Sequence, residues 1–198
     1  MHEDLQRIRV VLVQPQEPRN VGQVCRAMKT MGLGRLVLVG ADGLDVEQAG
    51  ITALHAKQVL EQAQFCATLE EALRDAVLAA GVSRRRGRWR KYFALDPEQL
   101  AERFASCRGP CALVFGRESD GLTDEELARC HVAVRIPSSP EFPSLNLSHA
   151  VQILAYVLYR SLGGGRQDRF VPIEAAELER LVECIVASLS SLGFFRKG

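Results

Sequence analysis

The sequence predicts an α/β fold built around a mostly parallel sheet of five to six strands, with helices on both faces. Three observations lead to this prediction. Short β-branched runs alternate with helical patterns along the first 160 residues, which is typical of β-α-β units. The strand segments are continuous apolar runs, as expected for strands that are covered on both faces. A chain of 198 residues also suits one domain of this kind with a small appendage.

The first forty residues predict one complete β-α-β unit. The run I-R-V-V-L-V at 8–13 predicts a buried strand, and R-L-V-L-V at 35–39 predicts the next one. Between them we expect a helix, and Asn20 is well placed to cap its start. Arg26 falls on the polar face of that helix. The usual interpretation of such an arginine is a solvated surface residue.

The middle of the chain repeats this pattern. We expect helices near 46–62, 69–74, 97–105 and 124–130, and strands at 64–67, 76–82, 112–115 and 132–136. Thr123 and Glu126 have the spacing of a capping box, which begins the fourth of these helices. Three prolines fall within 136–146, and each one removes a backbone donor. The segment can therefore be neither a central strand nor a helix interior, so we expect a loop. The helix after the loop is apolar over so broad a surface that we expect it to be buried.

The chain divides into three predicted parts. Residues 1–162 form the α/β domain, and 163–172 form a linker that begins with three glycines. Residues 173–198 form a helical extension with an apolar face along one side. The sequence shows no internal repeat.

Composition limits the possible partners. The formal net charge of +1 argues against a uniformly basic nucleic-acid coat, so such binding would need a local patch. No apolar run is long enough for a membrane span and the start lacks a signal-peptide core, so we expect a cytoplasmic protein without membrane contact. The six cysteines are scattered without metal-ligand spacing, and we expect free thiols and no metal.

Two segments at predicted strand ends carry candidate chemistry, since ligands of open α/β sheets gather beyond the carboxyl ends of strands. In F-G-R-E-S-D-G-L at 115–122, Gly116 allows close approach of a ligand and Glu118 is a loop carboxylate. The Lys-Ser/Thr pair of a phosphate loop is missing, which argues against an NTPase. Ser144 and Asn146 precede the apolar helix, where they either cap its first turn or contact a ligand.

A third segment, S-R-R-R-G-R-W-R-K-Y-F at 83–93, combines dense positive charge with aromatic rings. Guanidinium groups neutralise phosphates and rings stack on bases, a pairing suited to single-stranded or looped RNA. A solvated run of charges is the alternative. The residues we expect to bind RNA are Arg85, Arg86, Arg88, Trp89, Arg90 and Lys91.

Three motifs together resemble the SpoU branch of the SPOUT methyltransferases, and within it most closely the TrmJ group of tRNA ribose 2′-O-methyltransferases. They are P-x-x-P-R-N-V-G-x-V-x-R-A-M-K-T-M-G-L at 15–33, L-V-F-G-R-E-S-D-G-L at 113–122 and I-P-S-S-P-E-F-P-S-L-N-L-S-H-A-V at 136–151. The resemblance covers 8–160, in order and at similar spacing. The basic segment is denser in arginine than is usual for this group.

This resemblance implies a SPOUT fold with a C-terminal trefoil knot, S-adenosylmethionine as methyl donor, and a homodimer. By motif, it assigns catalytic roles to Asn20, Arg26, Glu118 and Asn146. The implied cofactor contacts are Val82, Ser83, Arg84, Gly116, Ile136, Ser144 and Leu145.

The implied reaction is direct methyl transfer to a ribose 2′-hydroxyl, without metal or covalent intermediate. Arg26 would act either as a base or as an electrostatic stabiliser, because a guanidinium normally stays protonated. The expected substrate is tRNA, at a cytidine or uridine of the anticodon loop. The alternatives are a ribosomal RNA 2′-O-methyltransferase, a non-catalytic RNA-binding protein of the same fold, and a nucleotide-binding α/β enzyme, the last disfavoured by the missing phosphate-loop residues.

Overall fold

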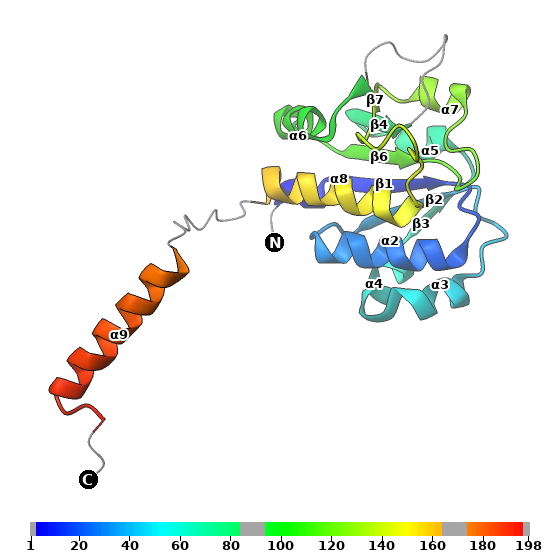
Figure 1. Cartoon of the computed structure of the whole chain (residues 1–198). Helices are drawn as coiled ribbons and strands as arrows, with labels where there is room; N and C mark the ends of the chain where they lie inside the picture. The colour runs from blue at the N-terminus through cyan, green and yellow to red at the C-terminus, as the bar shows by residue number, and fades with distance from the viewer. Residues whose placement is uncertain (1–2, 84–93, 164–173, 196–198) are drawn as a thin grey trace. The chain divides into compact units, whose positions relative to one another are not determined.

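A parallel sheet of seven strands forms the centre of the first of two compact units, residues 1–165 and 166–198. The computed structural model describes residues 3–83, 94–163 and 174–195 (Figure 1). The strands, in their order across the sheet, are β3 (Gln64–Cys66), β2 (Arg35–Val39), β1 (Ile8–Val13), β6 (Cys111–Phe115), β4 (Leu78–Val82), β7 (Val132–Val134) and β5 (Ala94–Leu95). All neighbouring pairs are parallel, so the predicted α/β class is confirmed.

The predicted strand number was wrong: the sheet has seven strands, not five to six. The additional strand is β5, which has two residues and pairs with β7. A strand of two residues is too short to show any periodicity in the sequence.

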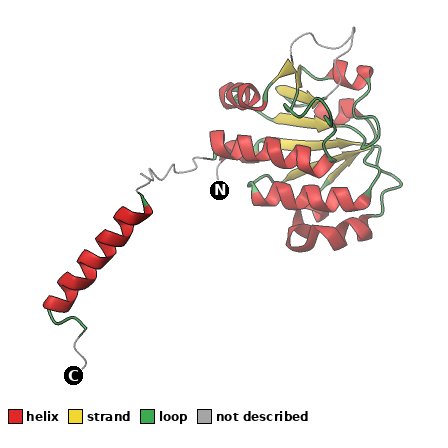
Figure 2. Cartoon of the chain, viewed as in Figure 1, coloured by secondary structure: helices red, strands yellow, loops and turns green. Residues whose placement is uncertain are grey.

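Helices cover both faces of the sheet (Figure 2). The helical elements are α1 (Glu3–Gln6), α2 (Pro18–Thr30), α3 (Val46–Ala53), the short 3-10 helix η1 (Leu54–Ala56), α4 (Lys57–Glu61), α5 (Leu69–Leu73), α6 (Pro97–Ser106), α7 (Asp124–Arg129), α8 (Leu147–Leu162) and α9 (Ala175–Ser191). Along β1, Val10 and Leu12 belong to one core cluster and Val11 and Val13 to the other. The first cluster includes α2, α6 and α8, and the second includes α5 and α7.

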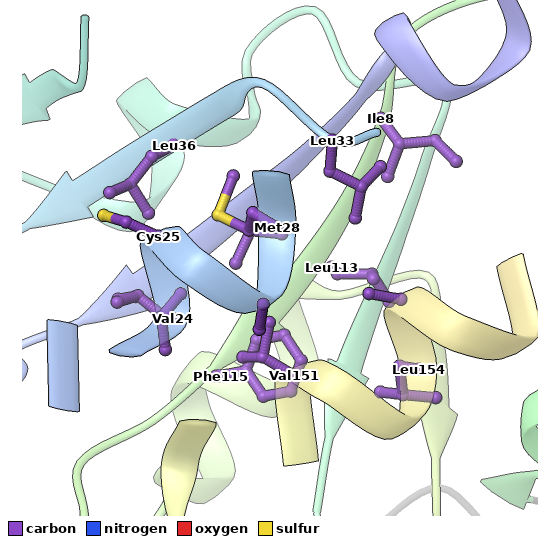
Figure 3. Close-up of a cluster of buried hydrophobic side chains, with 14 of the residues drawn as sticks. Ile8, Val24, Cys25, Met28, Leu33, Leu36, Leu113, Phe115, Val151 and Leu154 are labelled. Atoms are coloured by element: carbon purple, nitrogen blue, oxygen red, sulfur yellow. The ribbon is translucent and has the colours of Figure 1, made fainter. Parts of the chain in front are cut away.

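The larger cluster holds α2 and α8 together against the sheet (Figure 3). Met28 of α2, Val151 and Leu154 of α8, and Leu113 and Phe115 of β6 are all at most 2% exposed. Full burial of such a side chain stabilises the fold by roughly 1.5–3 kcal/mol. This packing places the start of α8 beside the start of α2, so residues from both helix starts can contact each other.

Helix α2 begins earlier than expected. Its N-cap is Glu17, whose side chain accepts a hydrogen bond from the Arg19 main chain, and Pro18 occupies the first turn. The prediction that Asn20 caps this helix was therefore wrong. Gly22 lets the helix approach α3, because a Cβ atom there would collide with the Ala49 carbonyl oxygen.

Two other helix predictions have different outcomes. The helix expected at 46–62 is broken into α3, η1 and α4, with Leu54 at a φ of 50° at the break. Helix α8 is capped by Asn146, whose side chain accepts from the Ser148 main chain. Its apolar side is buried as expected, but Tyr156 and Tyr159 remain 49% and 37% exposed.

The second unit contains α9. This helix has no side-chain cap and no buried residue. Its apolar side chains Leu178, Leu181, Val182, Ile185 and Val186 are about half exposed. The predicted linker at 163–172 lies outside the described residues, apart from Gly163.

Candidate functional site

A pocket opens beyond the carboxyl ends of β4, β6 and β7. Its cavity volume is about 110 Å³, and it is open to solvent on one side. The walls combine apolar side chains with two carboxylates and the glycine-bounded loop after β6. The lining residues are Val82, Ser83, Phe115, Gly116, Arg117, Glu118, Ser119, Asp120, Gly121, Ile136, Pro143, Ser144, Leu145, Leu147 and Ala150.

Six of the seven residues expected to contact the cofactor line this one pocket. They are Val82, Ser83, Gly116, Ile136, Ser144 and Leu145. Gly116 keeps the loop closed, because a Cβ atom at this position would collide with the main chain of Gly121. The seventh residue, Arg84, and the RNA-binding residues predicted at 85–91 lie outside the described part of the chain.

Glu118 joins the first loop of the chain to the loop after β6. Its carboxylate accepts hydrogen bonds from the main-chain N–H groups of Gln16, at 2.9 Å, and Glu17, at 3.3 Å. The Nδ2 atom of Asn20 donates to the same carboxylate at 3.1 Å. Three donors on one carboxylate fix its orientation.

Asn20 also contacts the start of α8, which brings three of the four predicted catalytic residues together. Asn146 Nδ2 donates to Asn20 Oδ1 at 3.0 Å. Asn146 Oδ1 in turn accepts from the Ser148 main chain at 2.9 Å. Asn146 is therefore a helix cap, one of its two expected roles, and it also belongs to the side-chain network beside the pocket.

Two further residues belong to this network, and the sequence alone did not assign either of them to the site. The Ser148 hydroxyl lies 2.7 Å from Asn146 Oδ1 and 3.0 Å from Gln23 Oε1. Ser148 is only 6% exposed, on the buried side of α8. A serine within an otherwise apolar helix face was the available signal, since buried hydroxyls need hydrogen-bond partners.

Arg117 was also missed, although it borders the pocket. Its guanidinium binds both carboxylate oxygens of Glu126, at 2.8 and 3.0 Å. Hydrogen bonding to Glu126 raises the pKa of Arg117 above its ordinary value. Burial opposes ionisation of Glu126, but hydrogen bonds from Arg117 and from the Thr123 main chain outweigh burial and lower the pKa of Glu126. The predicted capping box of Thr123 and Glu126 is present at the start of α7.

Arg26 is not brought to the pocket within the described chain. Its side chain is exposed on α2, and it is not among the residues that line the pocket. Arg26 lies six residues beyond Asn20, which corresponds to about 9 Å along a helix.

The described part of the chain also shows what its acidic, histidine and cysteine side chains and its longest helices can offer. No group of three or more His, Cys, Asp or Glu residues could hold a metal ion there. No helix in the same ranges is long and apolar enough to cross a bilayer. All six cysteines are free, and burial raises the pKa of the Cys25 thiol to about 12.

The fold and the site define an α/β protein with a ligand pocket at the carboxyl edge of a parallel sheet, flanked by an Asn-Glu-Asn network. A profile of the SpoU rRNA Methylase family matches residues 7–156. The chain belongs to this family, as its three motifs suggested.

Named relatives agree with this assignment. The chain is 47% identical over 155 residues to the tRNA (cytidine/uridine/adenosine-2′-O-)-methyltransferase TrmJ of Pseudomonas aeruginosa, an alignment that covers 77% of this chain and 60% of the relative. It is 41% identical to the tRNA (cytidine/uridine-2′-O-)-methyltransferase TrmJ of Yersinia pestis, over 98% of this chain and 79% of the relative.

A solved structure shares the fold. The probable methylase family protein from Haemophilus influenzae Rd KW20 superposes with a TM-score of 0.77 at 34% identity, covering 98% of this chain and 83% of that chain.

Proposed function

We propose that this protein transfers a methyl group from S-adenosylmethionine to a ribose 2′-hydroxyl of tRNA. The observation that carries the proposal is the convergence of Asn20, Glu118 and Asn146 at the edge of the pocket lined by the expected cofactor residues. The names of the Pseudomonas and Yersinia relatives support this reaction. A non-catalytic RNA-binding protein would not need such a network.

The pocket suits S-adenosylmethionine chemically. This cofactor carries a flat purine, a ribose and a positively charged sulfonium, and it supplies an activated methyl group. The apolar walls formed by Val82, Ile136 and Leu145 match the purine. The carboxylates of Glu118 and Asp120 in the lining match the positive charge. We propose that Ser83 and Ser144 supply polar contacts at the strand and helix ends.

In the proposed mechanism the chain aligns the ribose hydroxyl with the methyl donor and helps to remove one proton. Alignment supplies most of the rate, because a neutral alcohol is a poor nucleophile and geometry replaces a chance encounter. Asn20 and Asn146 are held by Glu118 and by the first turn of α8, so their amides form a rigid border to the pocket. Arg26 would act as the base or stabilise the developing alkoxide.

We propose a homodimer, which would also explain how Arg26 takes part. Arg26 does not line the pocket of its own chain, so a second copy would have to present it. The exposed Tyr156 and Tyr159 on α8 offer an aromatic surface for such an interface. The trefoil knot, the division into domains and the cytoplasmic location remain part of this proposal, by family likeness.

A mixed-dimer experiment tests the shared site. Arg26→Ala and Asn146→Ala chains are each expected to be nearly inactive alone. In a mixed dimer, one of the two sites would combine an intact Asn146 from one chain with an intact Arg26 from the other. We expect mixing to restore up to about half of the activity per mixed dimer, and no restoration would mean that each chain uses its own Arg26.

We propose the anticodon loop of tRNA as the target, at a cytidine or uridine. Ribosomal RNA is the second candidate, because the description of the matched family names it. The protein should be incubated with labelled S-adenosylmethionine and total RNA, and ribose methylation should then be mapped. We expect label in tRNA. Label in ribosomal RNA alone would mean that ribosomal RNA, and not tRNA, is the substrate. No label in any RNA would favour a non-catalytic RNA-binding protein.

A further inference from the structure

A second recess lies at the carboxyl ends of β1 and β2, next to the pocket described above. Its cavity volume is about 320 Å³. Its lining comes from the loop after β1, from the loop after β2 and from Arg117. Arg117 also lines the first pocket, so the two cavities share a wall. None of the motif assignments gives this recess a role.

Gln14 is fixed in the recess by its oxygen. Arg117 donates to Gln14 Oε1 twice, from Nε at 2.9 Å and from Nη2 at 2.6 Å. Because both partners are donors, the amide oxygen must face Arg117 and the Nε2 group must face elsewhere. Nε2 has no hydrogen-bond partner among the described residues. The Gln14 side chain is exposed, so its amide is an oriented donor that can meet solvent or a ligand.

The backbone around Gln14 is also unusual. Gln14 has a φ of 46°, a conformation that residues other than glycine rarely adopt. Gly40, at a φ of 58°, leaves room for its amide, since a Cβ atom at Gly40 would stand 3.0 Å from Gln14 Cγ and 3.4 Å from Gln14 Nε2. Strained residues tend to occur where function needs a particular orientation.

Gln16 is fixed in the same way. Its Oε1 atom accepts a hydrogen bond from the Ser119 main-chain N–H at 3.2 Å. The oxygen is thus identified by its donor partner, and Gln16 Nε2 is left as a second donor with no partner in the described ranges. Both glutamines line the recess. In each of these amides the oxygen already accepts a hydrogen bond, so the recess offers two N–H₂ groups as donors.

Two donors call for an acceptor ligand, and the local charge favours a neutral one. The charge of Arg117 is balanced by Glu126, and Asp42 and Glu118 lie in the flanking loops. A phosphate would meet these carboxylates without an unpaired cation among the lining residues. A carbonyl or ring-nitrogen acceptor on a nucleobase fits better.

We propose that this recess binds the minor-groove edge of the target nucleobase. Pyrimidine O2 and adenine N3 are acceptors on that edge, and the ribose 2′-hydroxyl lies in the same groove. With the 2′-hydroxyl at the first pocket, the base edge would face Gln14 and Gln16 across Arg117. Guanine adds an amino donor on this edge, which would oppose the two amide donors. The recess therefore accepts cytidine, uridine and adenosine and rejects guanosine.

This inference rests on the proposed function, and substitution of the two glutamines by glutamate tests it. Gln14→Glu and Gln16→Glu keep the oxygen that Arg117 or Ser119 binds, replace the free donor with an acceptor and add one negative charge. Gln58→Glu, on the exposed part of α4, makes the same chemical change elsewhere. Each variant is assayed on four transcripts of the tRNA that the wild type methylates, with C, U, A or G at the target position.

We expect the wild type to methylate the C, U and A transcripts and to leave the G transcript nearly unmodified. In the glutamate variants, kcat/KM should fall roughly 10–100-fold for C and U and rise for G, as the loss and reversal of a base contact predict. Affinity for S-adenosylmethionine should stay within about twofold of wild type, and Gln58→Glu should behave as wild type.

A wild-type protein that methylates G as well as C, or variants that lose activity equally on all four transcripts, would overturn the nucleobase assignment. Either result leaves the proposed reaction intact, because methylation of RNA is still observed. Absence of methylation by the wild type on every RNA would instead overturn the proposed function, and with it this inference.

Discussion

The two edges of the parallel sheet use polar side chains differently. At the amino edge, long side chains bind main-chain carbonyl groups: Gln6 donates to the Gly32 oxygen at 2.7 Å, and Arg9 donates to the Ala72 oxygen at 3.0 Å. At the carboxyl edge, side chains bind main-chain N–H groups and also link three elements through one another, as Asn20 does with Glu118 and Asn146. Two open cavities lie at the carboxyl edge.

This difference separates stability from function. A side chain that satisfies a main-chain carbonyl replaces water in the folded state, so its loss lowers the free energy of unfolding. A network of side chains beside a cavity contributes less to folding and more to the alignment of a ligand. Amino-edge variants should lose stability at constant activity per folded molecule, and carboxyl-edge variants should do the reverse.

The largest expected effect is that of Arg26→Ala on methyl transfer. We expect kcat to fall at least about 100-fold, because the proton of the ribose hydroxyl would leave without help. Affinity for S-adenosylmethionine, measured by titration calorimetry, should change by no more than about twofold, since Arg26 does not line the pocket. Arg19→Ala, an exposed arginine on the same helix, is the matched control. Equal loss of affinity and rate would refute the catalytic assignment.

At the opposite edge, Arg9→Ala should destabilise the fold by about 2–4 kcal/mol, through lost packing and two lost hydrogen bonds. Arg9 is 5% exposed on β1, and its Nη2 atom donates to Asp75 at 2.6 Å. Chemical denaturation measures the loss, and kcat/KM below the transition should match wild type. Arg9→Met keeps the apolar stem and isolates the hydrogen bonds. A variant that folds normally but loses activity would contradict the division between the edges.

A third effect, of roughly tenfold, is expected for Glu118→Gln at the carboxyl edge. The carboxylate now accepts three hydrogen bonds. The amide of glutamine would turn one N–H group toward one of these three donors, so at least one hydrogen bond would be lost. Asn20 would then lose its fixed orientation, so kcat should fall while the thermal midpoint changes little. Glu125→Gln, exposed on α7, is the control. A large fall in the thermal midpoint would show that Glu118 mainly stabilises the fold rather than aligning the site.

The same contrast explains how far the sequence could predict this molecule. Buried parallel strands leave apolar runs, so the bounds predicted for β1 and β2 match the structure. The pocket could be located because strand ends in parallel sheets converge. The two-residue β5 was missed because it leaves no pattern.

Partners distant in sequence were harder to predict. Asn20 was expected to cap a helix because its type suits caps, but its partner Glu118 lies 98 residues away and only the fold brings them together. Gln14 and Arg117 gave no signal for the same reason, since their pairing and the positive φ of Gln14 arise from tertiary structure. Local pattern predicts elements, and it does not predict which side chains of different elements meet.

The smallest effect, and a test of the amino edge alone, is the pH dependence contributed by Asp75. The hydrogen bond from Arg9 holds the pKa of Asp75 below its ordinary value. A carboxyl whose pKa is lowered by folding stabilises the folded state above its unfolded pKa, near 3.9, and this stabilisation is lost as pH falls through the lower folded value. The thermal midpoint of Asp75→Asn should therefore lie below that of wild type at pH 7, and the gap should close below about pH 4. The side chain is 59% exposed, so solvent screening keeps the gap small.

The control is Asp42→Asn. Asp42 is an exposed carboxylate without an ion-pair partner among the described residues, so the gap between this variant and wild type should not close at low pH. A gap for Asp75→Asn that persists into acid would mean that its ionised pair with Arg9 contributes nothing to the stability of this edge.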